Sequence, residues 1–278
     1  MKHLGIAIIL FFFISANAVY AQSCCNNPND KFAALAKSSD FRSEHELPAD
    51  IHFQAKYGHM IQFACPDNIE ANAYFVPAKK TSNKWLIVIH EWWGLNDHIK
   101  EEAEKLYGDL DNINILALDM YDGNVAGNRE EASQYMQGLS KERAYSIISG
   151  MLNYIGNVAE LCTIGWCFGG GWSLQTAIES GTKTIGCVMY YGMPDEDVSR
   201  LKKLNSDVLG IFASQDEWIN AEVIASFEVN MEEASKTLKV YTYDADHAFA
   251  NPSSPRYVEK AAQDAYKVAI EYLRLKFK

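Results

Sequence analysis

One cysteine stands where nucleophilic chemistry would be expected. The run Gly165-Trp166-Cys167-Phe168-Gly169 follows an apolar, strand-like stretch and precedes an amphipathic, helix-like one. This is the strand–turn–helix setting of the pattern G-x-S-x-G, with cysteine in place of serine. Such a turn holds its nucleophile in a strained backbone conformation, and side chains at the two glycines would collide with neighbouring elements. A thiol above a helix N-terminus favours its thiolate form. The pattern therefore predicts acyl transfer through Cys167.

An acid and a base follow at the ends of two later strand-like runs. Asp216 comes just after the run 208–213, and His247 comes just after the run 238–243. The order nucleophile, acid, base is the one that this kind of turn requires. Asp246 is a second candidate for the acid, but it adjoins the histidine that it would orient. We therefore predict that Asp216 holds His247 and that His247 contacts Cys167.

The loop after an earlier strand-like run contains candidates for the oxyanion donors and for a carboxylate near the thiol. Glu91 and Trp92 follow the apolar run 84–90, at the loop that donates to the oxyanion in such sites. We expect the backbone N–H groups of Trp92 and Phe168 to face the oxyanion. Glu91 is expected near the thiol, where it could accept or relay the proton.

Metal and cofactor motifs fail at specific positions. Gly94 stands where the zinc motif H-E-x-x-H needs its second histidine after His90 and Glu91. Leu174 stands where a dinucleotide fingerprint needs its third glycine. We predict no cofactor and no metal.

Each of these residues also has a purely structural alternative. Cys167 could be a buried packing residue, Asp216 a turn or helix-cap residue, His247 a loop residue, and Glu91 the partner of a basic side chain. Aromatic residues near these positions could line an apolar pocket or simply fill the core: Trp92, Trp93, Trp166, Tyr190 and Tyr191.

The rest of the chain alternates apolar and amphipathic runs, as βα units do. The expected strands are 60–65, 71–75, 84–90, 113–119, 161–165, 185–191, 208–213 and 238–243. The expected helices are 97–110, 141–158, 167–179, 221–235 and 255–277. Continuously apolar central strands indicate a sheet covered on both faces, and the early strands indicate an antiparallel edge. We predict an α/β-hydrolase fold, a mostly parallel eight-stranded sheet with helices on both faces.

Taken together, these residues resemble the dienelactone hydrolase family from about residue 50 to the end of the chain. The marks are Gly165-x-Cys167-x-Gly169-Gly170, Glu91, Asp216 and His247-Ala248-Phe249. The resemblance implies that Cys167, Asp216 and His247 form a catalytic triad and that Glu91 controls the ionisation of the thiol. The chain departs from the family at Asn251, where an arginine that binds the substrate carboxylate is expected.

The N-terminus is typical of an exported protein. Lys2 precedes an apolar run that ends in small residues, which predicts a signal peptide over residues 1–21 with cleavage after Ala18 or Ala21. A retained anchor helix and a lipoprotein processed at Cys24 are the alternatives. Residues 22–49 are expected to form a leader segment on the domain surface, and residues 50–278 the α/β-hydrolase domain. The expected location is periplasmic or secreted.

Composition narrows the choice of partners. A formal charge of -11 argues against nucleic acid and against anionic membranes, so we expect no membrane insertion after signal removal. Cys65, Cys162 and Cys187 lie in apolar runs and are expected to be buried packing residues rather than part of a dense disulfide framework; Cys24 and Cys25 follow the signal. The leading hypothesis is a hydrolase acting on a small-molecule ester or lactone. A thioesterase and a non-catalytic binding protein of the same fold are the alternatives.

Overall fold

A computed structural model describes residues 28–43 and 45–278, and the predicted signal peptide lies outside them. The strands are β1 (His59–Phe63), β2 (Ala71–Val76), β3 (Lys84–Ile89), β4 (Asn114–Leu118), β5 (Glu160–Trp166), β6 (Thr184–Tyr190), β7 (Val208–Ala213) and β8 (Leu238–Tyr243). The helices are α1 (Pro28–Leu35), α2 (Ser39–Ser43), α3 (Asp97–Asp109), α4 (Arg129–Gly138), α5 (Lys141–Ile155), α6 (Phe168–Ser180), α7 (Val198–Leu201), α8 (Ala221–Glu233) and α9 (Glu259–Lys276), with a short 3₁₀ turn at Gly181–Lys183.

The strands form one eight-stranded sheet in the order β1-β2-β4-β3-β5-β6-β7-β8. β2 pairs antiparallel with β1 at the edge and with β4 on its other side, and the remaining pairings are parallel. β4 and β7 are buried along their whole length, as strands covered on both faces must be. The predicted fold class is confirmed, because all eight predicted strands are present.

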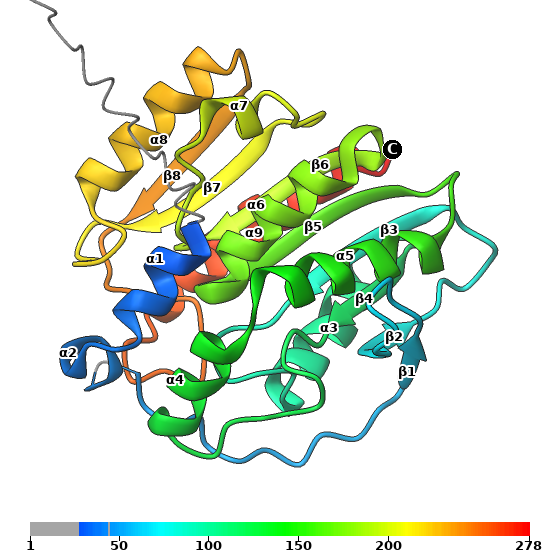
Figure 1. Ribbon diagram of the computed structural model, residues 1–278, viewed down its shortest axis with the longest axis horizontal. Helices are drawn as coiled ribbons and strands as arrows, with labels where there is room; N and C mark the ends of the chain where they lie inside the picture. Colours follow the sequence, from blue (N-terminus) through cyan, green and yellow to red (C-terminus); the bar gives the residue numbers. More distant parts are fainter. Residues whose placement is uncertain (1–27, 44) are drawn as a thin grey trace, which may run out of the picture.

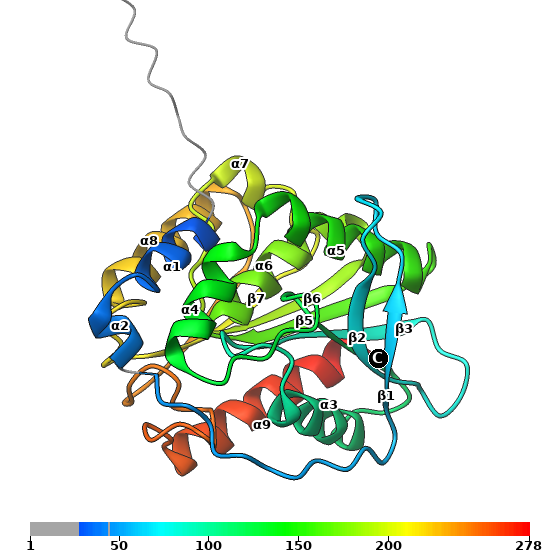
Figure 2. The same ribbon diagram turned by 60° about the horizontal axis from the view of Figure 1, so that its bottom comes forward.

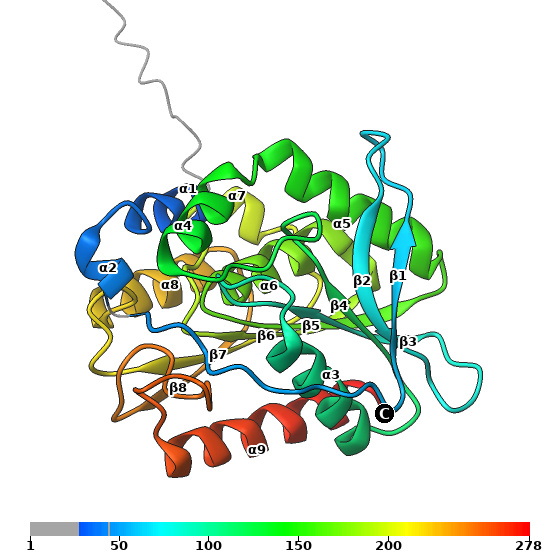
Figure 3. The ribbon, with the colours of Figure 1, turned by 90° about the horizontal axis from the view of Figure 1, so that it is seen from below.

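Helices cover both faces of this sheet. α3 and α9 lie on one face, and α5, α6 and α8 lie on the other (Figures 2 and 3). α6 packs on β5 and β6, which brings the N-terminus of this helix to the carboxyl ends of the parallel strands. Ligands bind at this end in open α/β sheets. Along residues 28–43 and 45–278, no helix combines the length and the apolar character needed to cross a bilayer.

The N-terminal segment, residues 28–43 with His45, packs more deeply than a leader on the surface would. α1 contacts α4 and α6, and α2 contacts α4, on the same face of the sheet as α8 (Figures 1 and 2). Phe32 and Ala36 are spaced by four residues, so they share one helical side, and both are buried. Phe41 is fully buried as well. The segment therefore contributes apolar side chains to the core of the domain.

Candidate active site

Cys167 occupies a strained turn between β5 and α6, here called the elbow. Its φ of 55° and ψ of −120° lie in a region that residues other than glycine rarely adopt. Its backbone N–H donates to the carbonyl of Tyr190 at 3.0 Å, which ties the turn to β6. A Cβ atom at Gly165 would overlap the backbone of Gly169, and one at Gly169 would overlap the carbonyl of Ile89. Both glycines are thus required for close approach, as the sequence predicts.

His247 and Asp216 form a buried pair next to this turn. Nδ1 of His247 donates to Oδ2 of Asp216 at 2.6 Å, and both side chains are almost fully buried. The other carboxylate oxygen of Asp216 accepts from the backbone N–H groups of Trp218 and Ile219, each at 2.9 Å. Asp246, the rival acid, accepts instead from the backbone N–H of His247. Asp216 is therefore the carboxylate that orients the imidazole.

The pKa values of this pair move in the directions that suit a base and its orienting acid. Burial raises the pKa of Asp216, but the charge and the hydrogen bond of His247 outweigh it, so the net shift is downward. Burial lowers the pKa of His247, but the charges of Asp216 and Cys167 raise it well above its ordinary value. An imidazole in this setting accepts a proton readily and holds it beside the sulfur.

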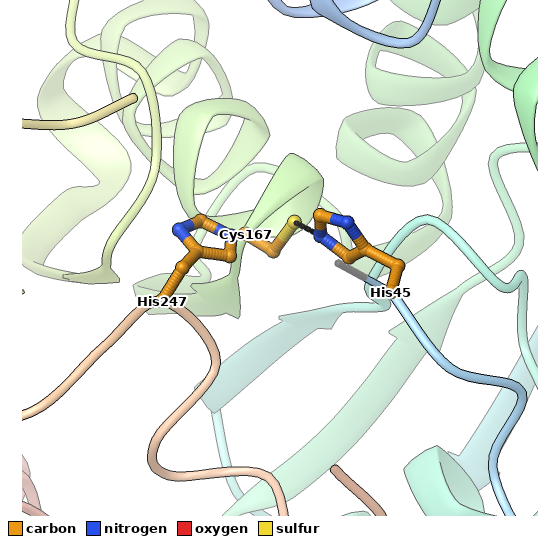
Figure 4. Close-up of side chains that lie close together, drawn as sticks. All are labelled: His45, Cys167 and His247. Carbon is orange, nitrogen blue, oxygen red and sulfur yellow. Dashed lines mark hydrogen bonds between the residues drawn. The ribbon is translucent and has the colours of Figure 1, made fainter. Parts of the chain in front are cut away.

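The structure brings the Cys167 thiol close to His247. Nε2 of His247 and Sγ of Cys167 lie within 4.8 Å of each other, and the two side chains face one another in Figure 4. Burial raises the pKa of Cys167, the charge of His247 lowers it, and the charge of Glu91 raises it further. The N–H of Phe168, at the start of α6, lowers this pKa through a hydrogen bond to the sulfur.

Glu91 lies beside the site but does not hold the thiol proton. Asn251 Nδ2 donates a hydrogen bond to Oε2 of Glu91, while the thiol of Cys167 donates to Nε2 of His45. Burial raises the pKa of Glu91 to about 7, against the charge of His247 and the hydrogen bond of Asn251. The expected hydrogen bond between Glu91 and the thiol is thus replaced, although the carboxylate still opposes ionisation of Cys167.

A buried histidine fixes the loop that carries Glu91 and Trp92. Nδ1 of His90 donates to the carbonyl of Glu91, and Nε2 of His90 accepts from the N–H of Met120 at 3.0 Å. Trp92 follows in this loop, and its side chain is fully buried. In the sequence, His90 belongs only to a failed zinc motif, because no local pattern reveals its partner Met120 in a distant loop.

His45 reaches the nucleophile from the N-terminal segment, and no sequence pattern indicated it. Its Nε2 lies 3.9 Å from Sγ of Cys167, and its Nδ1 donates to the carbonyl of Phe41 at 2.8 Å (Figure 4). Its ring centroid lies 4.5 Å from that of Trp92 and 5.5 Å from that of His247. Burial and the charge of His247 lower the pKa of His45 to about 3, so the imidazole is neutral.

Two cavities adjoin these residues. The one that contains Cys167, His45 and Glu91 holds only about 20 Å³, which is room for about one water molecule. A cavity of about 550 Å³ lies on the other side of Glu91 and Asn251, lined in part by Trp93, Trp166 and Tyr190. These three aromatic residues, predicted as either pocket lining or core, line the larger cavity. Glu91 and Asn251 border both cavities, so they separate the nucleophile from the larger one.

Comparisons with known proteins show the family of the chain. The family model "Dienelactone hydrolase family" matches residues 71–277. The chain belongs to the dienelactone hydrolase family. A carboxymethylenebutenolidase of Pseudomonas sp. (strain P51) is 29% identical over 115 residues, covering 41% of this chain and 47% of that protein. Protein usf of Aquifex pyrophilus is 23% identical over 230 residues, covering 78% of this chain and 98% of that protein.

Solved structures of the family share the fold. A dienelactone hydrolase-like promiscuous phosphotriesterase from metagenomic libraries superposes with a TM-score of 0.66 at 20% sequence identity. The match covers 78% of this chain and 98% of that chain. Membership of the dienelactone hydrolase family makes the chain a dienelactone hydrolase-like hydrolase, and the matched range contains the elbow, the acid and the base.

Proposed function

We propose that this protein hydrolyses the ester bond of small-molecule esters or lactones by acyl transfer through Cys167, His247 and Asp216. One observation carries the proposal: a strained elbow presents a thiol within 4.8 Å of an imidazole that a buried carboxylate holds at 2.6 Å. A nucleophile, a base and a group that orients the base are the parts that covalent acyl transfer requires.

The steps follow from the roles of these side chains. Nε2 of His247 takes the proton of Cys167, and the thiolate attacks the carbonyl carbon of the substrate. The N–H groups of Trp92 and Phe168 then donate to the oxyanion of the tetrahedral intermediate. His247 returns the proton to the leaving oxygen, which leaves a thioester on Cys167. Water, deprotonated by His247, attacks the thioester. The tetrahedral intermediate then releases the acid, and His247 returns the proton to the sulfur of Cys167.

Glu91 would control when the thiol ionises. Its buried carboxylate, ionised above about pH 7, raises the pKa of Cys167. Like charges disfavour each other, so the resting thiol stays protonated and is protected from oxidation. Asn251 holds the carboxylate on the side of the larger cavity. A substrate entering from that cavity would displace Glu91 and free the thiolate.

The substrate class follows from the walls of the larger cavity. Trp93, Trp166 and Tyr190 offer it an apolar, aromatic surface, which suits the apolar part of an ester. Asn251 offers a neutral amide where the family resemblance expects an arginine for the substrate carboxylate. We therefore favour neutral esters and lactones over dienelactone. A thioester presents the same carbonyl to the thiolate, so thioesterase activity is the second candidate.

Replacing the nucleophile tests the proposal. We expect Cys167→Ala to lower kcat/KM on a panel of aryl esters and lactones by about 10⁴-fold or more, because the acyl-enzyme cannot form. Cys162→Ala is the matched control, since Cys162 is equally buried but lies in β5, away from the acid and the base. Retention of more than a few per cent of activity in Cys167→Ala would assign the hydrolysis to another group.

A further inference from the structure

The side chain of His45 gives the nucleophile a second imidazole neighbour. The nearest ligand atoms of His45, Cys167 and His247 all lie within 4.8 Å of one another, and all three side chains are buried. Figure 4 shows Cys167 between the two histidine rings. Acyl transfer needs only one of these imidazoles, that of His247, so the proposed mechanism gives His45 no role.

Both histidines are held in the same way. Nδ1 of His45 donates to the carbonyl of Phe41 at 2.8 Å, and Nδ1 of His247 donates to Asp216 at 2.6 Å. Each Nε2 therefore lies on the side of the sulfur. Nε2 of the neutral His45 offers a lone pair there, and Nε2 of His247 offers one once a metal ion has displaced its proton. Among the residues that the structure describes, Nε2 of His247 has no hydrogen-bond partner. Metal-binding histidines almost always donate their second ring N–H to a carboxylate or a backbone carbonyl in this way.

We infer that His45, Cys167 and His247 form a binding site for Zn²⁺. One thiolate and two imidazoles are a ligand set that zinc prefers, whereas Mg²⁺ and Ca²⁺ require oxygen ligands. Tetrahedral zinc places nitrogen and sulfur ligand atoms about 3.6 Å apart, given bond lengths of about 2.0–2.3 Å. The Nε2 of His45 and the Sγ of Cys167 already lie 3.9 Å apart.

The surroundings complete the site. The cavity of about 20 Å³ beside Cys167 has room for one water molecule as the fourth ligand. Glu91 lines the same cavity and can supply a negative charge near the cation. Binding replaces the S–H bond of Cys167 with an S–Zn bond and releases the proton to solvent.

Zinc at this site would act as a reversible inhibitor. A sulfur bound to zinc cannot attack a carbonyl carbon, and His247 Nε2 can no longer take a proton. The ion also joins the N-terminal segment to the elbow through His45. Metal binding depends only on the three ligands, whereas the inhibition rests on the proposed function.

The test uses Co²⁺ as a spectroscopic probe, followed by displacement with Zn²⁺. All proteins carry Cys24→Ser and Cys25→Ser, so that these adjacent thiols do not bind the metal. We expect the protein with the site intact to show thiolate-to-cobalt charge-transfer absorption that Cys167→Ala lacks. His45→Phe keeps an aromatic ring beside Trp92 but removes the ligand, so affinity should fall about 100-fold or more. His52→Ala removes an exposed histidine instead, and it should bind Co²⁺ as tightly as the protein in which all histidines are kept.

The results separate the site from the proposed function. Absence of the charge-transfer absorption, or equal affinity in His45→Phe, would overturn the zinc site. Urea unfolding midpoints of His45→Phe and His52→Ala confirm that both variants are folded. If cobalt binds through Cys167 but no ester is hydrolysed, the site stands and the proposed function fails. If esters are hydrolysed but neither Co²⁺ nor Zn²⁺ binds, the proposed function stands and the zinc site fails.

Discussion

The N-terminal segment covers the nucleophile, so loosening it should expose Cys167. Phe41 anchors the segment: its side chain is fully buried, and its ring packs at 5.5 Å from Phe32, 5.6 Å from Trp92 and 5.7 Å from Trp218. Cys167 is only 2% exposed while His45 lies over it. We predict that Phe41→Ala shifts the segment toward an undocked state in which the thiol is accessible.

The size of the effect follows from what the truncation removes. Replacing a buried phenylalanine with alanine costs about 3–5 kcal/mol, from lost burial and from the cavity left behind. Phe41 belongs to the segment itself, so most of this loss acts on docking. A shift of about 3 kcal/mol changes the ratio of undocked to docked protein by about 150-fold, at about 1.4 kcal/mol per factor of ten.

The assay is the rate at which iodoacetamide alkylates Cys167 under native conditions, followed by peptide mass spectrometry. When docking is faster than alkylation, the rate is proportional to the undocked population. We expect Phe41→Ala to be labelled about 150-fold faster than the unsubstituted protein. Cys162 and Cys187 are fully buried in the sheet, so their labelling reports global unfolding within the same sample.

A matched control separates local from global loosening. Phe227 in α8 is 1% exposed and lies outside the segment, so Phe227→Ala should lower the unfolding midpoint without speeding the labelling of Cys167 selectively. The reasoning fails if Phe41→Ala lowers the unfolding midpoint while Cys167 is labelled at the original rate. It fails equally if Phe227→Ala exposes Cys167 as much.

Two further predictions concern the thiol and the N-terminus. Glu91→Gln should hasten alkylation of Cys167 above about pH 7, because the ionised Glu91 raises the pKa of the thiol there. Below about pH 7, where Glu91 is protonated, the substitution should have little effect. Identical pH profiles of alkylation in the two proteins would show that Glu91 does not govern the nucleophile. We also propose that the protein is exported and that its mature chain begins between Val19 and Cys24, which mass spectrometry of the N-terminus decides, since an intact Met1 would contradict it.

Much of the fold and the main site residues could be predicted from local patterns. Buried parallel strands are continuously apolar, and β7 (Val208–Ala213) is such a strand, which the sequence predicts to the residue. The edge strand β8 (Leu238–Tyr243) is only partly buried, and its run of apolar and β-branched residues also gives its bounds. Asp216 and His247 follow these two neighbouring strands. Parallel strands end at the same edge of a sheet, so the chain order alone places the acid and the base together. The strained φ of Cys167 is predicted by the strand–turn–helix pattern around it.

Contacts between distant segments left no such local pattern. His45 and Cys167 are 122 positions apart, and their meeting depends on how α1 and α2 pack against α4 and α6. Asn251 was noted as a departure from the family, but its bond to Glu91 depends on the geometry of two loops. α4 (Arg129–Gly138) was missed because few of its residues are apolar, although Asn128 and Glu131 have the spacing of a helix cap.

The N-terminal segment makes access to Cys167 an equilibrium with two opposing ligands. The cavity of about 20 Å³ beside the sulfur is lined by both Glu91 and His45 and is too small for an ester. A substrate that enters past Glu91 therefore also needs the room that the undocked N-terminal segment leaves. Zinc requires His45 at the site and so binds the docked form. The apparent affinity of each ligand is proportional to the population of the form that it binds. Substrate and zinc therefore compete, even though they do not contact all the same residues. Phe41→Ala should therefore tighten the binding of a substrate while weakening that of zinc. A change of both affinities in the same direction would show that His45 packs beside the nucleophile without governing access to it.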